Sequence, residues 1–242
     1  MSVIRVRRRD ASWVLGLVLT AAAVTAAPPA GESAAATPAA EIPGAVIVLE
    51  AAPGTPGSDP TSAPPRFVLL KDGQVFVGGT SGLEAGRLEK AEAQALRRRA
   101  DALRKAVGRG GTLAFGGADQ RVARLRLPEE GPAAITITGD PAVAPPALRP
   151  LAGFVSELLS FDHPSLLPYA PASYVARARE ERLVGGCRPW SFSFPIEEAL
   201  HGLRVVPAAE VEGWPTGAWP ASVCVGDKRY VVTLRPLLPG ER

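Results

Sequence analysis

The sequence contains little of the chemistry on which most enzymes depend. Its 242 residues include only two histidines, two cysteines and one methionine. It has no serine-nucleophile elbow (G-x-S-x-G), no zinc-protease motif (H-E-x-x-H), no phosphate-binding loop (G-x-x-x-x-G-K) and no calcium loop. We therefore assign no catalytic residue and expect neither a bound metal nor a cofactor.

The chain also lacks a strong excess of one charge once its amino terminus is set aside. It carries 27 basic and 24 acidic residues, but residues 1–26 contain four of the basic residues and one of the acidic ones. The remaining 216 residues therefore have 23 of each sign. This balance gives no electrostatic indication of a nucleic acid or an anionic membrane as a partner.

The first 26 residues have the layout of a secretory signal peptide. Arg5 and residues 7–9 form a basic start, and residues 11–24 are mostly apolar but too short to span a bilayer comfortably. Small side chains at the end of this segment predict cleavage after Ala26. The general secretory route is favoured over twin-arginine export, and a retained membrane anchor is the alternative. We expect a mature protein in the periplasm or outside the cell, with no membrane span.

Cys187 and Cys224, the two cysteines, both lie in the last quarter of the chain. In an oxidising compartment, a single pair in one region is most simply explained by a disulfide. Two buried free thiols are the alternative. A catalytic thiol is disfavoured, because no histidine is near either cysteine in sequence and the compartment oxidises exposed thiols.

Composition divides the mature chain into three parts. Residues 27–65 are rich in Ala, Pro, Gly and Ser and predict a flexible leader, in which the apolar run 45–49 has the character of a short strand. Residues 66–163 have the periodicity of an ordered domain. Residues 164–242 are less regular and are treated as a C-terminal subdomain.

The ordered domain is expected to alternate hairpins and helices. The sequence FVLLKDGQVFV (67–77) predicts a hairpin with a type I′ turn at Asp72-Gly73. Residues 88–107 have helical periodicity, 123–138 alternate as a second hairpin, and 148–159 form a clearly amphipathic helix. We expect an α+β fold in which an antiparallel sheet of hairpins carries both helices on one face.

The C-terminal subdomain is expected to be a smaller, β-rich part stapled by the disulfide. Residues 173–178 have strand character, Pro195 begins a short helix, and residues 222–225 and 229–234 predict a hairpin. This subdomain either stands alone or extends the first sheet.

The few titratable candidates have structural explanations that compete with catalytic ones. His163 and His201 each follow a predicted helix, where an imidazole interacts well with the terminal carbonyls. Residues 162–165 (Asp-His-Pro-Ser) have the composition of a hydrolase site, but neighbouring residues on a helix point in different directions. Glu197-Glu198 and Glu129-Glu130 are expected at a helix start and in a hairpin turn.

Two clusters of side chains are candidates for contact with a partner. The basic cluster on the first helix is either a solvated helix face or a contact for an acidic partner or envelope polymer. The three late tryptophans either pack in a core or stack on sugars and peptides. The cluster residues are Arg97, Arg98, Arg99, Arg104 and Lys105, and the tryptophans are Trp190, Trp214 and Trp219.

The layout resembles a group of uncharacterised secreted proteins and lipoproteins of high-GC bacteria. The resemblance covers about residues 66–239 and depends on the strand-Asp72-Gly73-strand hairpin and on the late motif RPLLP at residues 235–239. It implies export and this fold, and it carries no known activity. The chain differs from the lipoprotein members because it has no lipidation cysteine.

Two functional hypotheses follow. The first is an exported, non-enzymatic envelope or extracellular protein that binds a protein or polymer partner. The alternative is a secreted hydrolase of unrecognised type, with His163 and Asp162 as its acid-base pair.

Overall fold

The computed structural model describes residues 42–52, 64–78, 82–107, 111–117, 122–127, 134–181, 186–216 and 220–241. The predicted signal peptide (1–26) and residues 27–41 and 53–63 of the predicted leader lie outside these ranges. The described residues confirm the α+β class, with one eight-stranded and one five-stranded sheet. The disulfide between Cys187 and Cys224 is present in the C-terminal part.

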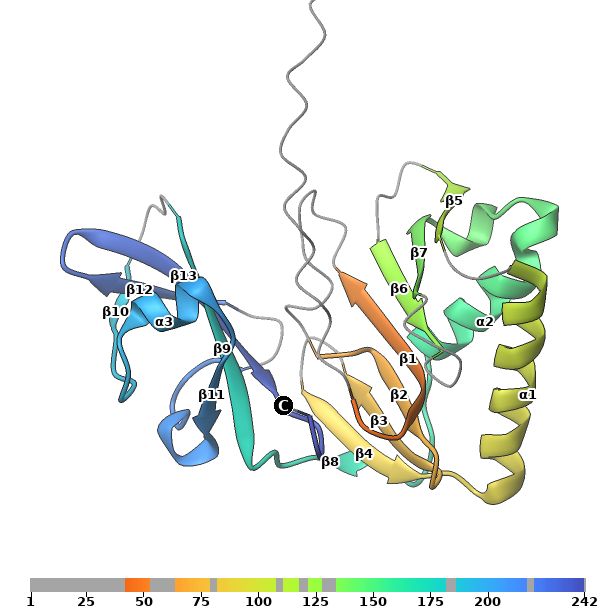
Figure 1. The fold of residues 1–242 in the computed structure, drawn as a ribbon, viewed down its shortest axis with the longest axis horizontal. Helices are drawn as coiled ribbons and strands as arrows, with labels where there is room; N and C mark the ends of the chain where they lie inside the picture. Colours follow the sequence, from red (N-terminus) through yellow and green to blue (C-terminus); the bar gives the residue numbers. More distant parts are fainter. Residues whose placement is uncertain are drawn as a thin grey trace, which may run out of the picture. The chain divides into compact units, whose positions relative to one another are not determined.

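The first sheet contains the two predicted hairpins, and its strand order is β5-β7-β6-β1-β2-β3-β4-β8 (Figure 1). The bounds are β1 (Ala45–Ala52), β2 (Phe67–Leu70), β3 (Gln74–Gly78), β4 (Leu83–Arg87), β5 (Gly111–Gly116), β6 (Val122–Arg126), β7 (Ala134–Gly139) and β8 (Leu167–Pro168). The apolar run 45–49 is therefore a central strand that pairs with β2 and β6. The domain expected to begin at Arg66 therefore also includes β1, which supplies the middle of its core.

Two local expectations need correction. The sheet is not wholly antiparallel, since β5 at its edge runs parallel to β7. The first hairpin has a three-residue loop, residues 71–73, instead of a two-residue type I′ turn. Gly73 has a φ of 87°, which glycine adopts without strain, and the Asp72 carboxylate accepts a hydrogen bond from the Gln74 N–H.

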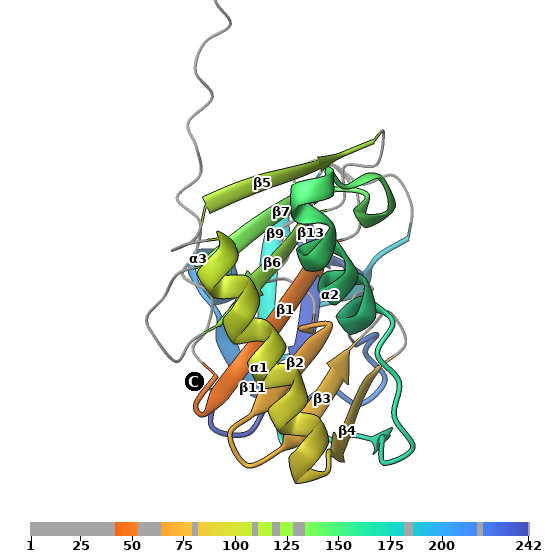
Figure 2. The ribbon, with the colours of Figure 1, turned by 90° about the vertical axis from the view of Figure 1, so that its right-hand side faces the viewer.

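Both long helices cover one face of the first sheet, as the sequence predicts (Figure 2). These helices are α1 (Lys90–Val107) and α2 (Arg149–Leu159), and the short 3₁₀ helices η3 (Pro141–Val143) and η4 (Pro146–Leu148) precede α2. Their apolar faces pack with the inward residues of the sheet in the main core. Among the described residues, no helix combines the length and apolar character needed to cross a membrane.

The C-terminal residues form a sheet of their own, in the order β10-β12-β13-β9-β11. Its elements are β9 (Ser173–Glu180), β10 (Arg188–Pro189), α3 (Ile196–His201), β11 (Arg204–Pro207), η5 (Ala208–Glu210), β12 (Ala221–Val225) and β13 (Lys228–Pro236). Apart from β8, this part does not extend the first sheet. A second core between α3 and one face of this sheet is separate from the first.

The RPLLP motif ends β13 and continues onto the outer face of the first sheet. Leu238 is buried among the outward-facing residues Val48, Val68 and Phe76. Glu241 accepts hydrogen bonds from the Arg235 guanidinium, at 3.0 and 2.5 Å, and from the Leu238 N–H at 3.0 Å. The motif is thus explained as a structural clasp, in which an apolar anchor is fixed by a buried ion pair.

Candidate functional site

His163 lies in a polar cluster, but its carboxylate partner is not the one expected from sequence. Its Nδ1 atom is 2.8 Å from the Ser165 Oγ and accepts the Ser165 N–H at 3.2 Å. Its Nε2 atom faces the Glu92 carboxylate of α1 at 3.5 Å, while the Asp162 side chain is exposed. Because Nδ1 accepts, the proton is assigned to Nε2, on the side of Glu92.

Ser165 and Glu92 of this cluster also have structural partners. The Ser165 Oγ accepts the Arg87 N–H at 3.1 Å, and a Cβ added at Gly86 would lie 2.6 Å from this oxygen. Glu92 accepts the Glu89 N–H at 2.9 Å and so caps the first turn of α1. The cluster therefore ties the chain after α2 to β4 and α1. A serine packed this closely against a strand has little room to attack a substrate.

Of the two neighbouring glutamate pairs, only Glu197-Glu198 lies among the described residues. Glu197 and Glu198 lie in the first turn of α3, as expected, and Glu198 pairs with Arg204 at 2.5 Å. Glu129-Glu130 lies outside the described residues. Among the residues that the structure does describe, no group of three or more His, Cys, Asp or Glu side chains is arranged to hold a metal ion.

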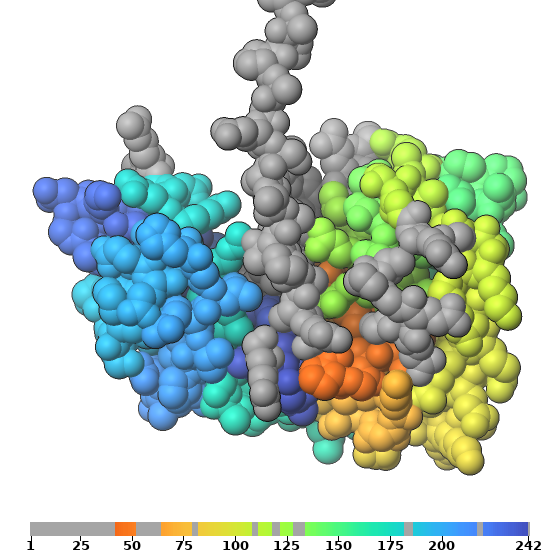
Figure 3. Space-filling view, viewed as in Figure 1, coloured from red at the N-terminus to blue at the C-terminus, as the bar shows by residue number. Residues whose placement is uncertain are grey.

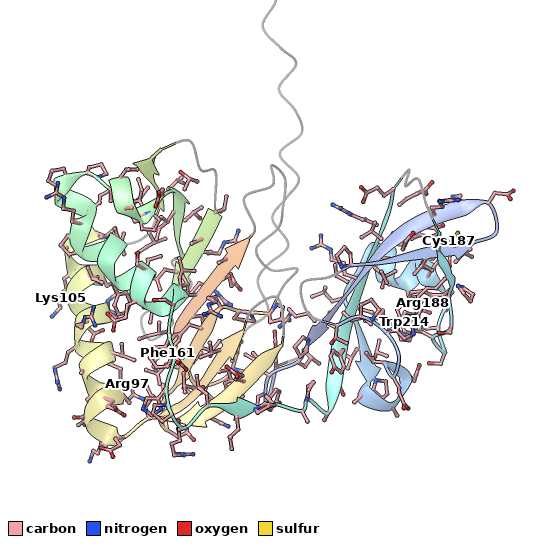
Figure 4. The ribbon with its side chains drawn as sticks, turned by 180° about the vertical axis from the view of Figure 1, so that it is seen from behind. Arg97, Lys105, Phe161, Cys187, Arg188 and Trp214 are labelled. Carbon is pink, nitrogen blue, oxygen red and sulfur yellow. A yellow bond between two sulfur atoms is a disulfide. The ribbon has the colours of Figure 1, made fainter. Side chains whose placement is uncertain are left out.

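The basic cluster of α1 is largely engaged in contacts within the protein. Arg97 donates hydrogen bonds to the carbonyls of Leu70, the last residue of β2, and of Lys71 in the first hairpin loop, at 3.0 and 2.5 Å. Arg99 pairs with Glu157 of α2 at 2.6 Å. Arg97 and Lys105 are labelled in Figure 4. These contacts favour a structural role for much of the cluster, although Arg98 and Lys105 are exposed.

A small hollow beside α1 is lined by two cations of this cluster, Arg97 and Arg104. Val46, Arg97, Asp101, Arg104 and Leu127 line it. Asp101 lies 3.4 Å from Arg104, and Arg97 is bonded to the hairpin loop. Asp101 therefore balances Arg104, whereas Arg97 donates to neutral carbonyls, and its buried Nε has no hydrogen-bond partner among the described residues.

The late tryptophans pack in the second core wherever they are described. Trp214 is buried against Phe192, with ring centroids 4.4 Å apart, and Arg188 lies 4.1 Å above its ring (Figure 4). The Trp190 indole N–H donates to the Phe194 carbonyl at 2.6 Å. Trp219 lies outside the described residues. For the other two, packing explains the aromatic rings and their polar edges better than sugar stacking.

The predicted disulfide joins the chain before β10 to β12. Cys187 and Cys224 have Cα atoms 5.6 Å apart and are separated by 37 residues in sequence. β10 pairs in parallel with β12 beside the bond. The disulfide therefore secures one edge of the second sheet and leaves β11 as the opposite edge.

A buried charge network lies on the outer face of the first sheet. Glu50 is 4% exposed and pairs with Arg126 at 2.8 Å. Burial raises the pKa of Glu50 above its ordinary value of 4.5, and the positive charges of Arg126, Arg124 and Arg235 oppose that shift. The Glu50 Oε2 atom has no hydrogen-bond partner in this structure. Such a carboxylate makes the stability of this face dependent on pH.

The surface that sequence analysis missed is the free edge of β11. Among the described strands, β11 pairs only with β9, and Val205 and the preceding Leu203 are 55% and 43% exposed. The space-filling view shows the light-blue chain from α3 onward at the molecular surface (Figure 3). The available signal was the short β-branched pair at 205–206 followed by proline, a pattern found at sheet edges.

Comparisons with known proteins yield no match among protein-family models, curated proteins or solved structures.

Proposed function

We propose that this is an exported, non-enzymatic protein of the bacterial envelope or extracellular space, which binds a protein partner through the edge of β11. Export is supported by the basic and apolar amino terminus and by the disulfide, a bond that persists in oxidising compartments. The resemblance to secreted proteins of high-GC bacteria points the same way.

The observation that carries the binding proposal is the combination of a free strand edge with exposed apolar side chains. Natural sheets usually protect an open edge with charge, prolines or a covering loop. Here Leu203 and Val205 are exposed, although Pro207 shortens the strand. An open edge binds extended polypeptide through backbone hydrogen bonds, so it favours a protein over an envelope polymer as partner.

Capture from envelope extracts of the producing organism tests this function. The bait is the tagged full chain recovered from that organism, compared with Val205→Lys and with Val143→Lys, a control whose original side chain is similarly exposed at 54%. We expect the wild type and the control to retain the same protein, and Val205→Lys to lose it. No retained protein, or equal retention by all three baits, would contradict the proposal.

A hydrolase remains the second candidate, because the His163 ring lies between the Ser165 hydroxyl and the Glu92 carboxylate, with one ring nitrogen facing each. It predicts that Ser165→Ala abolishes hydrolysis of a broad ester and peptide panel by the wild-type protein. A wild type inactive on that panel, or an equally active Ser165→Ala variant, would leave the cluster with its structural role.

A further inference from the structure

We propose that the protein bound at β11 is a second copy of this chain, and that two β11 strands pair antiparallel about a two-fold axis at Val205. This inference rests on the proposed role of β11 and names its partner. The pairing is inferred from the backbone N–H and carbonyl groups of β11 that point away from β9.

The hydrogen bonds to β9 fix those outward groups. The Ala208 N–H donates to the Ala172 carbonyl at 3.0 Å, which continues the register of Val206 with Tyr174 and Arg204 with Ala176. In an antiparallel ladder, alternate residues exchange both bonds with one neighbour. Arg204 and Val206 therefore bond to β9, and the N–H and carbonyl of Val205 point away from the sheet.

The same alternation makes the free edge complementary to itself. Leu203 and Pro207 have the same orientation as Val205, so the outward groups are two N–H donors and three carbonyl acceptors. Rotation about Val205 places its N–H against the carbonyl of the second Val205. It also places the Leu203 N–H against the carbonyl of the second Pro207. Each outward N–H then has an acceptor on the second strand. Because Pro207 has no N–H, the Leu203 carbonyl opposite it is the one outward group without a partner from that strand.

The side chains are also compatible with this pairing. Val206 is buried in the second core, so Leu203, Val205 and Pro207 lie together on the opposite face. The two-fold axis places Val205 beside Val205 of the second copy, and Leu203 beside Pro207 of the second copy. These side chains form one apolar row across the interface.

The charge on the other face does not oppose the pairing. Arg204 lies on the face of α3, where it pairs with Glu198 at 2.5 Å and lies 5.5 Å from the Phe194 ring. Each copy therefore brings its own counter-charge. The contact is smaller than a standard interface of roughly 1,600 Å², so we expect reversible, concentration-dependent association.

Sedimentation velocity and cysteine cross-linking test the dimer on the full chain recovered from its producing cells. We expect a monomer–dimer equilibrium whose dissociation constant rises about tenfold or more in Val205→Lys and is unchanged in Val143→Lys. In the pairing, the two Val205 Cα atoms lie about 5.5 Å apart, within disulfide range. Val205→Cys should therefore form an intermolecular disulfide much faster than Val143→Cys under mild oxidation.

The opposite results would overturn the inference. These are a monomer at every concentration, a dimer indifferent to Val205→Lys, or equal cross-linking of the two cysteine variants. A monomer that still captures a different protein through β11 would refute the second copy as partner while leaving the proposed function intact.

Discussion

Removing the buried ion pair of the C-terminal clasp should cost far more stability than removing an exposed pair. Arg235 and Glu241 have side chains only 9% and 2% exposed, with two hydrogen bonds between them. In Glu241→Gln the Arg235 charge stays buried without its main counter-charge, a loss that typically costs 3–5 kcal/mol. Because the Glu50 carboxylate also interacts with Arg235, we expect the lower end of that range, about 3 kcal/mol.

Urea unfolding measures this effect, with Asp72→Asn as the matched control. Asp72 and Arg87 form an ion pair at 2.9 Å whose side chains are more than half exposed, so its loss should cost below about 1 kcal/mol. Glu241→Gln should lower the unfolding midpoint by about 1 M urea or more, at slopes of 1–3 kcal/mol per M. Similar midpoints for the two variants would refute the view that the clasp contains a buried ion pair.

Three further changes are expected to alter stability measurably. Replacing Cys187 and Cys224 together by serine should lower the free energy of unfolding by about 4 kcal/mol for a 37-residue separation; unchanged urea curves would contradict a structural disulfide. Leu238→Ala should cost about 2–5 kcal/mol, and a loss below 1 kcal/mol would show that the clasp is not packed. Because the folded-state pKa of Glu50 is raised, the folded protein binds its proton more tightly, so this residue's contribution to stability is lost as pH rises above about 4.5 through the folded-state pKa. Glu50→Gln should flatten urea midpoints measured across that window, whereas an unchanged slope would refute the assignment.

Periodicity was sufficient to predict the elements whose two sides differ in polarity. In α1, Ala93, Leu96, Ala100 and Leu103 are buried, and this spacing is visible in the sequence. In β6 and β7, buried and half-buried residues alternate. Such patterns can be recognised in a short stretch of sequence. The structure then shows which element each apolar face packs against.

The elements that sequence analysis missed or undervalued lack that local signal. β1 is buried on both faces, so its apolar run resembles an isolated segment rather than the middle of a sheet. β11 has only four residues, and the role proposed for it depends on its position at the edge of the sheet. The partners of Arg235 and His163 are likewise set by tertiary contacts.

Amide hydrogen exchange at Leu203 and Val205 tests the role of β11 most directly. In the dilute monomer these outward-facing N–H groups should exchange quickly, while those of Arg204 and Val206, bonded to β9, should be protected. At high protein concentration, or with a captured partner, we expect exchange at Leu203 and Val205 to slow by about tenfold or more, as a bound fraction above 90% requires. Unchanged exchange at both residues while another segment becomes protected would contradict the account.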